Sequence, residues 1–395
     1  MTTINIERLF EPITINGLTL SNRFVVPAMQ QALSRDGDPT SDLADFYSSR
    51  VAGGAGLVIT ESTAIDHWSA NWQPMATRLW PSTLASWKSM VDGVKNQGGK
   101  IFVQLWHPGS MRTPPEGKTF ERESLSPSGL ASGSTESGRP MTRAEMIEIR
   151  DAYVSTAVAA KGLGCDGVEV HGAHGYLLDQ FLWADTNVRD DEWGGAALEN
   201  RLRFPAEVVR AIRHAVGPDF PIGYRLSQWK EIDFDGKIAQ SPQEFELILK
   251  TLRDAGVDLF NVSVRRFDTP EWDGSDLGLA GWAKTFTDAP VITVGGVGLT
   301  SDLASELWEG APTKNDTEAT LARLITRFDN GEFDLVAVGR AHLADGEWVS
   351  KVREGRYDEI LSYSPEILLK IAAGWSDAPG DAAHSHTVEE AGITA

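Results

Sequence analysis

The chain has 395 residues, enough for one α/β barrel or for two or three smaller domains. Apolar residues make up 41% and charged residues 23%, which excludes a disordered, collagen-like or coiled-coil protein. The net charge of −20 repels phosphate backbones and anionic lipid, so neither nucleic-acid binding nor membrane binding is predicted. The single cysteine cannot form an intrachain disulfide, and no signal peptide or membrane-spanning pattern is present. We therefore expect a cytoplasmic protein.

The first element in chain order is a hairpin over residues 13–20. Its two alternating apolar runs are joined by Asn16-Gly17, a dipeptide that is typical of a two-residue hairpin turn. Eight short apolar runs follow, and several are near-continuous in Val, Ile and Leu, as strands buried on both faces are. The runs cover residues 23–28, 56–60, 100–105, 167–171, 221–225, 258–262, 290–294 and 334–339.

Helical patterns separate these runs. In residues 146–160 and 245–255 the apolar positions recur every three or four residues, as on the buried face of a helix. Eight strands alternating with helices predict an α/β fold, a (β/α)₈ TIM barrel with the N-terminal hairpin closing its bottom. An open, doubly wound sheet is the alternative.

Two connections, residues 106–141 and 263–289, lack strand or clear helix patterning. Loops of this length in a compact domain are usually functional, and on a barrel they would lie at the catalytic rim. We expect a single domain over residues 1–375. The polar residues 376–395 are expected to form a mobile tail.

The end of the fourth predicted strand carries His171, His174 and Tyr176. Two neutral imidazoles can donate to one carbonyl oxygen and stabilise its developing negative charge, and a phenol can protonate the adjacent carbon. A metal site with Asp179 or Glu169 as the third ligand is an alternative. A purely structural cluster is another, and the spacing alone leaves all three open.

Two further strand ends carry single polar residues. Gln104 ends the third strand, and its amide offers a donor and an acceptor that suit the edge of a planar heterocycle. It could equally cap the barrel mouth. Arg225 ends the fifth strand, where it would face an anion or an electron-rich ring edge. A salt-bridged arginine at the rim is the alternative.

The seventh and eighth strands end in Gly295-Gly296 and in Gly339-Arg340. Glycines let backbone N–H groups approach a phosphate, and an arginine adds a charged fork. Barrels commonly bind phosphate at these two strand ends, so we predict a phosphate site there. The first cluster is not a GxGxxG motif, which disfavours a Rossmann nicotinamide site.

With these motifs in place, the chain resembles the Old Yellow Enzyme family of FMN-dependent ene-reductases. The resemblance runs from Leu9 to about Lys370. Its most specific stretches are residues 171–182 (HGAHGYLLDQFL) and 187–201 (NVRDDEWGGAALENR), with QLWHPG and AVGRA in support. The resemblance implies a barrel that holds FMN at its mouth and takes NADH or NADPH as reductant.

It also implies roles for single residues. Along the isoalloxazine it places the residues that follow the first strand: Pro27, Ala28, Met29 and Gln30. Ser62 would contact the flavin through its backbone, Gln104 would bind the pyrimidine edge, and Arg225 the N1/O2 region. Gln30 stands where the family usually has Thr or Cys, so we expect the redox tuning of the flavin to differ.

The remaining implied roles concern phosphate and substrate. The phosphate would be held by the residues after the last two strands: Gly295, Gly296, Gly339 and Arg340. His171 and His174 would bind the substrate carbonyl, and Tyr176 would be the proton donor.

The leading prediction is an FMN-dependent NAD(P)H oxidoreductase that reduces the activated C=C bond of α,β-unsaturated carbonyl compounds. Hydride would pass from the nicotinamide to the flavin and then, in a second half-reaction, to the alkene. A flavoenzyme of the same fold acting on a dienoyl thioester or an amine is one alternative, and a flavin-free phosphate-binding lyase or isomerase is another. The sequence leaves the natural substrate, the nicotinamide preference and the oligomeric state, including a homo-oligomer, open.

Overall fold

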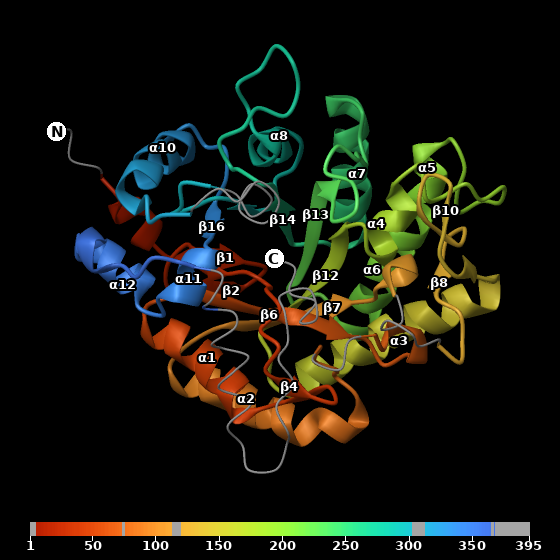
Figure 1. Ribbon diagram of the computed structural model, residues 1–395, viewed down its shortest axis with the longest axis horizontal. Coiled ribbons are helices and arrows are strands. Elements are labelled where there is room, and N and C mark those ends of the chain that lie inside the picture. The colour runs from red at the N-terminus through yellow and green to blue at the C-terminus, as the bar shows by residue number, and fades with distance from the viewer. Residues whose placement is uncertain (1–4, 73–75, 113–119, 302–312, 365–366, 368–395) are drawn as a thin grey trace.

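Eight parallel strands form a closed barrel at the centre of the computed structural model, with helices around it (Figure 1). The structure describes residues 5–72, 76–112, 120–301, 313–364 and 367. The barrel strands, in order around the ring, are β3 (Phe24–Val26), β6 (Leu57–Ala64), β7 (Ile101–Trp106), β12 (Gly167–His174), β13 (Ile222–Lys230), β14 (Leu259–Ser263), β15 (Val291–Val294) and β16 (Leu335–Ala337). Because β16 pairs with β3, the ring closes, which confirms the predicted (β/α)₈ barrel. The doubly wound alternative is wrong.

Three strands run at least three residues further than their apolar runs predicted. β6 continues to Ala64, β12 to His174 and β13 to Lys230. The added residues are largely polar but buried, because they line the upper end of the barrel rather than solvent. Hydropathy alone ends a strand where its apolar residues end, so it could not find these extensions.

The N-terminal hairpin consists of β1 (Ile13–Ile15) and β2 (Leu18–Leu20). Its turn residues Asn16 and Gly17 have φ angles of 42° and 79°, the left-handed conformation that this tight turn requires. Two hairpin residues, Ile15 and Leu20, are fully buried in one cluster with residues that open their barrel strands, among them Leu57, Leu259 and Leu335. The hairpin therefore closes the bottom of the barrel, as predicted.

The helices cover the outside of the barrel. Their bounds are α1 (Ser41–Ala52), α2 (Leu84–Asn96), α3 (Arg143–Gly162), α4 (Leu177–Leu182), α5 (Leu198–Arg201), α6 (Arg203–Val216), α7 (Pro242–Ala255), α8 (Leu279–Phe286), α10 (Thr317–Asp329), α11 (Arg340–Ala344) and α12 (Trp348–Arg353). Short 3₁₀ helices lie at Glu7–Phe10, Trp68–Ala70, Pro81–Thr83, Gly109–Met111 and Tyr357–Glu359. Within the described ranges, no helix combines the length and the apolar character that a membrane span needs.

The two helices predicted from spacing are present as α3 and α7. A capping box starts α3, with Thr142 and Glu145 each hydrogen-bonded to the other's backbone N–H. Helix α7 starts with Ser241 as N-cap and ends at Gly256, which is left-handed. The periodic apolar residues of both helices are buried. The buried face and the capping residues therefore both support a helix at each of these two places.

The prediction that two long connections lack regular structure is wrong. Residues 106–141 contain the short strands β8 (Leu125–Ser126), β9 (Leu130–Ser132), β10 (Thr135–Glu136) and β11 (Arg139–Pro140). Residues 263–289 contain α8, and another short hairpin, β4 (Ser34–Arg35) with β5 (Asp38–Pro39), was not predicted. Strands of two or three residues are too short for periodicity, and the small residues of α8 give a weak pattern. The expected tail, residues 376–395, lies outside the described residues.

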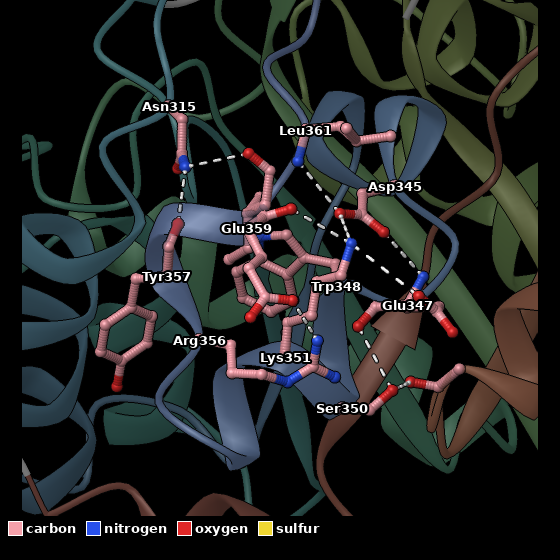
Figure 2. Close-up of polar contacts among 12 residues, drawn as sticks. Asn315, Asp345, Glu347, Trp348, Ser350, Lys351, Arg356, Tyr357, Glu359 and Leu361 are labelled. Atoms are coloured by element: carbon pink, nitrogen blue, oxygen red, sulfur yellow. Dashed lines mark hydrogen bonds and ion pairs between the residues drawn. The ribbon is translucent and has the colours of Figure 1, made fainter.

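A network of polar contacts fixes the chain after the last barrel strand (Figure 2). Lys351 Nζ lies 2.7 Å from Asp345 Oδ2, and both side chains are largely buried. The same carboxylate accepts hydrogen bonds from the backbone N–H groups of Glu347 (3.0 Å) and Leu361 (3.0 Å). Lys351 also donates to the carbonyl oxygen of Glu359 (3.2 Å). The network therefore holds the segment that begins with the predicted phosphate ligand Arg340.

We expect Asp345→Asn to destabilise the protein at neutral pH by roughly 1.5–3 kcal/mol, the usual worth of a hydrogen bond to a charged group. Burial raises the pKa of Asp345, but the hydrogen bonds from Lys351, Leu361 and Glu347 outweigh it and lower the pKa below its ordinary value. The stability from this carboxylate is therefore present above its unfolded pKa and lost as pH falls through the folded one. Urea unfolding should show a smaller difference between the two proteins in acid than at pH 7. An equal difference at both would contradict the assignment.

Candidate active site

His171, His174 and Tyr176 meet at the C-terminal end of β12. The two imidazole rings are nearly perpendicular, with their centroids 5.2 Å apart. The centroid of the Tyr176 ring lies 5.1 Å from that of the His171 ring. His174 has a φ of 64°, a left-handed conformation that is uncommon outside glycine and is found at functional sites. The turn that this residue starts brings the phenol back over the barrel mouth. The structure thus brings the three predicted side chains together.

His171 is fixed by a contact within its own strand, and His174 by contacts with neighbouring strands. The backbone N–H of Ala173 donates to Nδ1 of His171 (3.3 Å), so in the neutral ring the proton lies on Nε2. Nε2 of His174 lies 2.8 Å from Oγ of Ser263, and its ring stacks on Trp229 with centroids 4.3 Å apart. Each ring therefore has one orientation.

Both histidines are neutral at pH 7. Burial lowers the pKa of His171 and of His174 well below the ordinary value, and the nearby Arg225 guanidinium lowers both further. A neutral imidazole can donate one hydrogen bond to an oxygen without carrying a full charge in the ground state. The pair is suited to polarising a carbonyl group.

Arg225 is a buried cation with unused hydrogen-bonding capacity. It lies beside His171 in the paired strands and donates to the carbonyl oxygen of Ala28 (3.0 Å) and to Oγ of Ser263 (3.4 Å). Its Nε has no hydrogen-bond partner, and no ion pair joins it to a carboxylate among the described residues. The alternative of a salt-bridged rim arginine is therefore wrong. A buried guanidinium in this state fits an electron-rich ring edge such as that of a flavin.

Gln104 belongs to a largely buried network across four strands, β6, β7, β12 and β14. Ser62 Oγ donates to its Oε1 (3.1 Å), and its Nε2 donates to Glu169 (2.8 Å), which also accepts from Asn261 Nδ2 (2.7 Å). The network orients the amide and leaves one N–H hydrogen and one lone pair for a ligand.

The network also bears on the metal alternative. Glu169 is held by Gln104 and Asn261, and Asp179 pairs with Lys230, with Nζ 3.0 Å from the carboxylate. Across the part of the chain that the structure describes, no group of three or more metal-ligating side chains comes together. Both carboxylates that could have completed a site with the histidines thus serve other contacts.

The residues after β3 lie against the other strand ends. Ala28 contacts Arg225 as described, and a Cβ atom placed on Gly339 would lie 3.3 Å from Sδ of Met29 and 3.9 Å from Cγ of Pro27. Gln30 is buried and donates from Nε2 to Glu61 (3.2 Å). Burial raises the pKa of Glu61 to about 8, so this carboxyl is largely protonated at neutral pH.

The glycines after β15 and β16 lie in adjoining loops, since these strands pair up to Val294 and Ala337. Gly295 has a φ of 142°, and a Cβ atom there would lie 2.2 Å from the carbonyl oxygen of Val264, so only glycine fits. Arg340 is buried and donates from Nη2 to the carbonyl oxygen of Ser301 (2.6 Å). The glycines and one guanidinium thus lie in neighbouring loops, and the phosphate site stays a prediction.

Sequence reasoning missed three residues that contact the histidines or the tyrosine. Ser263 and Trp229 contact His174 as described, and Glu231 accepts a hydrogen bond from the hydroxyl of Tyr176 (2.9 Å). Ser263 directly follows an apolar run, so the same strand-end signal that found Gln104 could have found it. Trp229 lies within the unpredicted extension of β13 and Glu231 directly follows it, and the sequence carries no signal for either.

Comparison with known proteins identifies the family of the chain. The NADH:flavin oxidoreductase / NADH oxidase family matches residues 8–313. The chain belongs to this family. This confirms the resemblance to Old Yellow Enzyme and, with it, FMN as the expected cofactor.

Three relatives illustrate the similarity. The chain is 34% identical over 362 residues to an NADH oxidase of Thermoanaerobacter brockii, covering 89% of this chain and 52% of that protein. It is 31% identical over 383 residues to a cinnamate reductase of Clostridium sporogenes, covering 89% and 53%. The chain thus spans about half the length of these two relatives. A structure of morphinone reductase in complex with tetrahydroNAD superposes with a TM-score of 0.74 at 26% identity, covering 91% of this chain and 93% of that one.

If Arg340 holds the FMN phosphate, Arg340→Ala should weaken FMN binding at least about tenfold, because an anion that loses a buried charged partner loses about 2–5 kcal/mol. Flavin fluorescence during titration of the apoprotein with FMN measures this. Arg356→Ala is the matched control, since the ion pairs of Arg356 among the described residues are with Glu354 and Glu359 at the surface. An Arg340→Ala protein that kept a full complement of flavin through dialysis would contradict the assignment.

Proposed function

We propose that this member of the NADH:flavin oxidoreductase family reduces the activated C=C bond of α,β-unsaturated carbonyl compounds with NADH or NADPH. The observation that carries the proposal is the convergence of two neutral, buried imidazoles and one phenol at the barrel mouth, next to the buried guanidinium of Arg225. Two donors and one proton source are the groups that the reduction of a conjugated carbonyl compound requires.

The residues at the mouth fit FMN. Arg225, with its unpartnered Nε, and the oriented amide of Gln104 would bind the ring edge, and Ser62 and residues 27–30 would lie along the ring. Gly295, Gly296, Gly339 and Arg340 would hold the phosphate. When bound, FMN supplies hydride transfer, accepting a hydride from the nicotinamide and passing it to the alkene.

The protein's own groups then act on the substrate. His171 and His174 would donate hydrogen bonds to the carbonyl oxygen, which becomes more negative as hydride reaches the β-carbon. Because both rings are fixed before the substrate arrives, little reorganisation is needed as charge develops. Tyr176 would give its hydroxyl proton to the α-carbon, so the C=C bond becomes a C–C bond with one added hydrogen on each carbon.

A cavity of about 340 Å³ beside this site offers room for the rest of a ligand. It lies between the segments that follow β13 and β14, and its lining includes Trp229, which stacks on His174, as well as Phe234, Lys237 and Arg265. The lining also carries Asp235 and Glu271, and Glu271 pairs with Lys237 over 3.1 Å, so the cavity presents aromatic rings and charges of both signs. The aromatic side chains suit a ligand with a ring. The cavity therefore supports a substrate or nucleotide that extends past the reacting atoms.

Anaerobic flavin reduction tests the proposal. The purified protein should release FMN on heating, and NADH or NADPH should reduce the bound flavin. A panel of enones, a dienoyl thioester and an amine should then be offered to it. Reoxidation of the reduced flavin by the enones supports the proposal. Failure with every enone, together with turnover of the thioester or the amine, would favour the corresponding alternative.

A further inference from the structure

The hydroxyl of Tyr176 is engaged by a carboxylate that the reaction as described above does not use. Tyr176 donates to Oε2 of Glu231 over 2.9 Å, and this pair joins the turn after β12 to the end of β13. The backbone N–H of Glu231 donates to the carbonyl oxygen of His174 (3.2 Å). Two contacts therefore fix Glu231 relative to the turn that carries His174 and Tyr176.

Glu231 also differs from its surroundings in exposure. Tyr176 is 6% exposed, and its ring is enclosed by Trp106 and His171, with centroids 5.4 Å and 5.1 Å away. Glu231 is only half-buried and thus reaches solvent. The phenol is therefore largely shielded from bulk water, whereas the carboxyl group that touches it can exchange protons with water.

From this geometry we propose that Glu231 is a positioning and proton-return residue for Tyr176. The inference rests on the proposed function, because it needs Tyr176 to lose a proton in each cycle. Glu231 holds the phenol at one angle before the reaction. After the reaction it supplies the proton that restores the phenol.

The proton steps balance without a further reactant. The O–H bond of Tyr176 breaks as the C–H bond forms at the α-carbon, leaving a phenolate. The Glu231 carboxylate then takes a proton from water and passes it to the phenolate oxygen, which restores both the phenol and the carboxylate. No electrons move in these steps. Around the phenolate, the guanidinium of Arg225 opposes the negative charge, whereas an ionised Glu231 adds to it. The phenol is therefore restored more readily when Glu231 carries a proton.

The test compares Glu231→Gln, Tyr176→Phe and the double variant as holoenzymes. Glutamine keeps the size of the side chain but cannot pass on a proton. We expect E231Q to slow flavin reoxidation by an enone at least about tenfold, a fraction of the usual 10²–10⁴ for acid–base catalysis, and to leave flavin reduction unchanged. In the Tyr176→Phe background the same change should have no further effect. Asp254→Asn is the control, because it removes an exposed negative charge from α7, outside the lining of the cavity.

A second readout needs no turnover. The alkaline absorbance change of tyrosinate, taken as the difference from the Tyr176→Phe protein, should occur at lower pH in E231Q, since the negative carboxylate no longer opposes ionisation. Equal losses from E231Q with and without Tyr176 would overturn the inference, and so would an unshifted tyrosinate transition. Wild-type protein that reduces no enone would instead count against the proposed function itself, so the two failures are distinguishable.

Discussion

Tyr176→Phe is expected to slow enone reduction by about 10²–10⁴ while leaving flavin reduction by the nicotinamide nearly unchanged. The substitution removes only the hydroxyl and its hydrogen bond to Glu231, because phenylalanine keeps the edge-on packing against Trp106 and His171. Protonation of the α-carbon belongs to the second half-reaction, so only that half should suffer. Stopped-flow traces of the two half-reactions measure the effect separately.

Nitroalkenes provide the control for this variant. A nitro group stabilises the negative charge left after hydride transfer, so the reduced nitronate needs no immediate proton, and its formation should be spared in Tyr176→Phe. Equal losses with enone and nitroalkene, or a defect confined to flavin reduction, would exclude Tyr176 as the proton donor. His171→Ala should differ from Tyr176→Phe and affect both substrates, since it removes a donor to the developing oxyanion, with a loss of roughly 10²–10³.

Lys230→Met is expected to lower the free energy of unfolding by about 3–5 kcal/mol, because it leaves a buried carboxylate without its partner. Lys230 and Asp179 are both fully buried, and Asp179 also accepts the backbone N–H of Gly175 (2.7 Å). The pair therefore fixes the turn between His174 and Tyr176. Activity should fall together with stability, and urea unfolding of the holoenzyme measures the latter.

The loss of stability in Lys230→Met should change with pH in a direction that the pKa of Asp179 determines. Burial raises the pKa of Asp179 to about 6 although Lys230 opposes the rise, so in the variant the pKa should be higher still. A raised folded pKa means that stability is lost as pH rises through it, and the deficit should therefore be larger at pH 8 than at pH 5. The double variant Asp179→Asn/Lys230→Met carries no charge at either of these two buried positions and should recover most of the stability. A double variant as unstable as the single one would show that packing of the lysine stem, not charge, is responsible.

The barrel could be predicted from the sequence because apolar runs recur along the chain, separated by helical patterns. Every strand contributes a short apolar run, and the Asn16-Gly17 turn has its own local signal. The candidate site was predicted in part for a related reason: parallel strands place their C-terminal ends together, so the polar residues that end them must converge. His171, Gln104 and Arg225 follow this rule.

The contacts that orient those residues could not be predicted. Glu231 and Ser263 act through side-chain hydrogen bonds and Trp229 through stacking, all between neighbouring strands. The register of those strands is set by the closed ring rather than by local sequence. The sequence also gives no sign of the positive φ of His174, because only the surrounding structure forces a non-glycine residue into this conformation.

The backbone conformation of His174 limits what mutagenesis at this position can reveal. A left-handed residue is tolerated best as glycine, asparagine or aspartate, and a β-branched or bulky replacement would also strain the turn that carries Tyr176. A loss of activity in His174→Val would therefore mix the removal of an imidazole with the displacement of a phenol. His174→Asn keeps the conformation accessible and retains a side-chain N–H. Asparagine is thus the replacement that separates the chemistry of this position from its geometry, and a library selected for activity should enrich it over every β-branched residue.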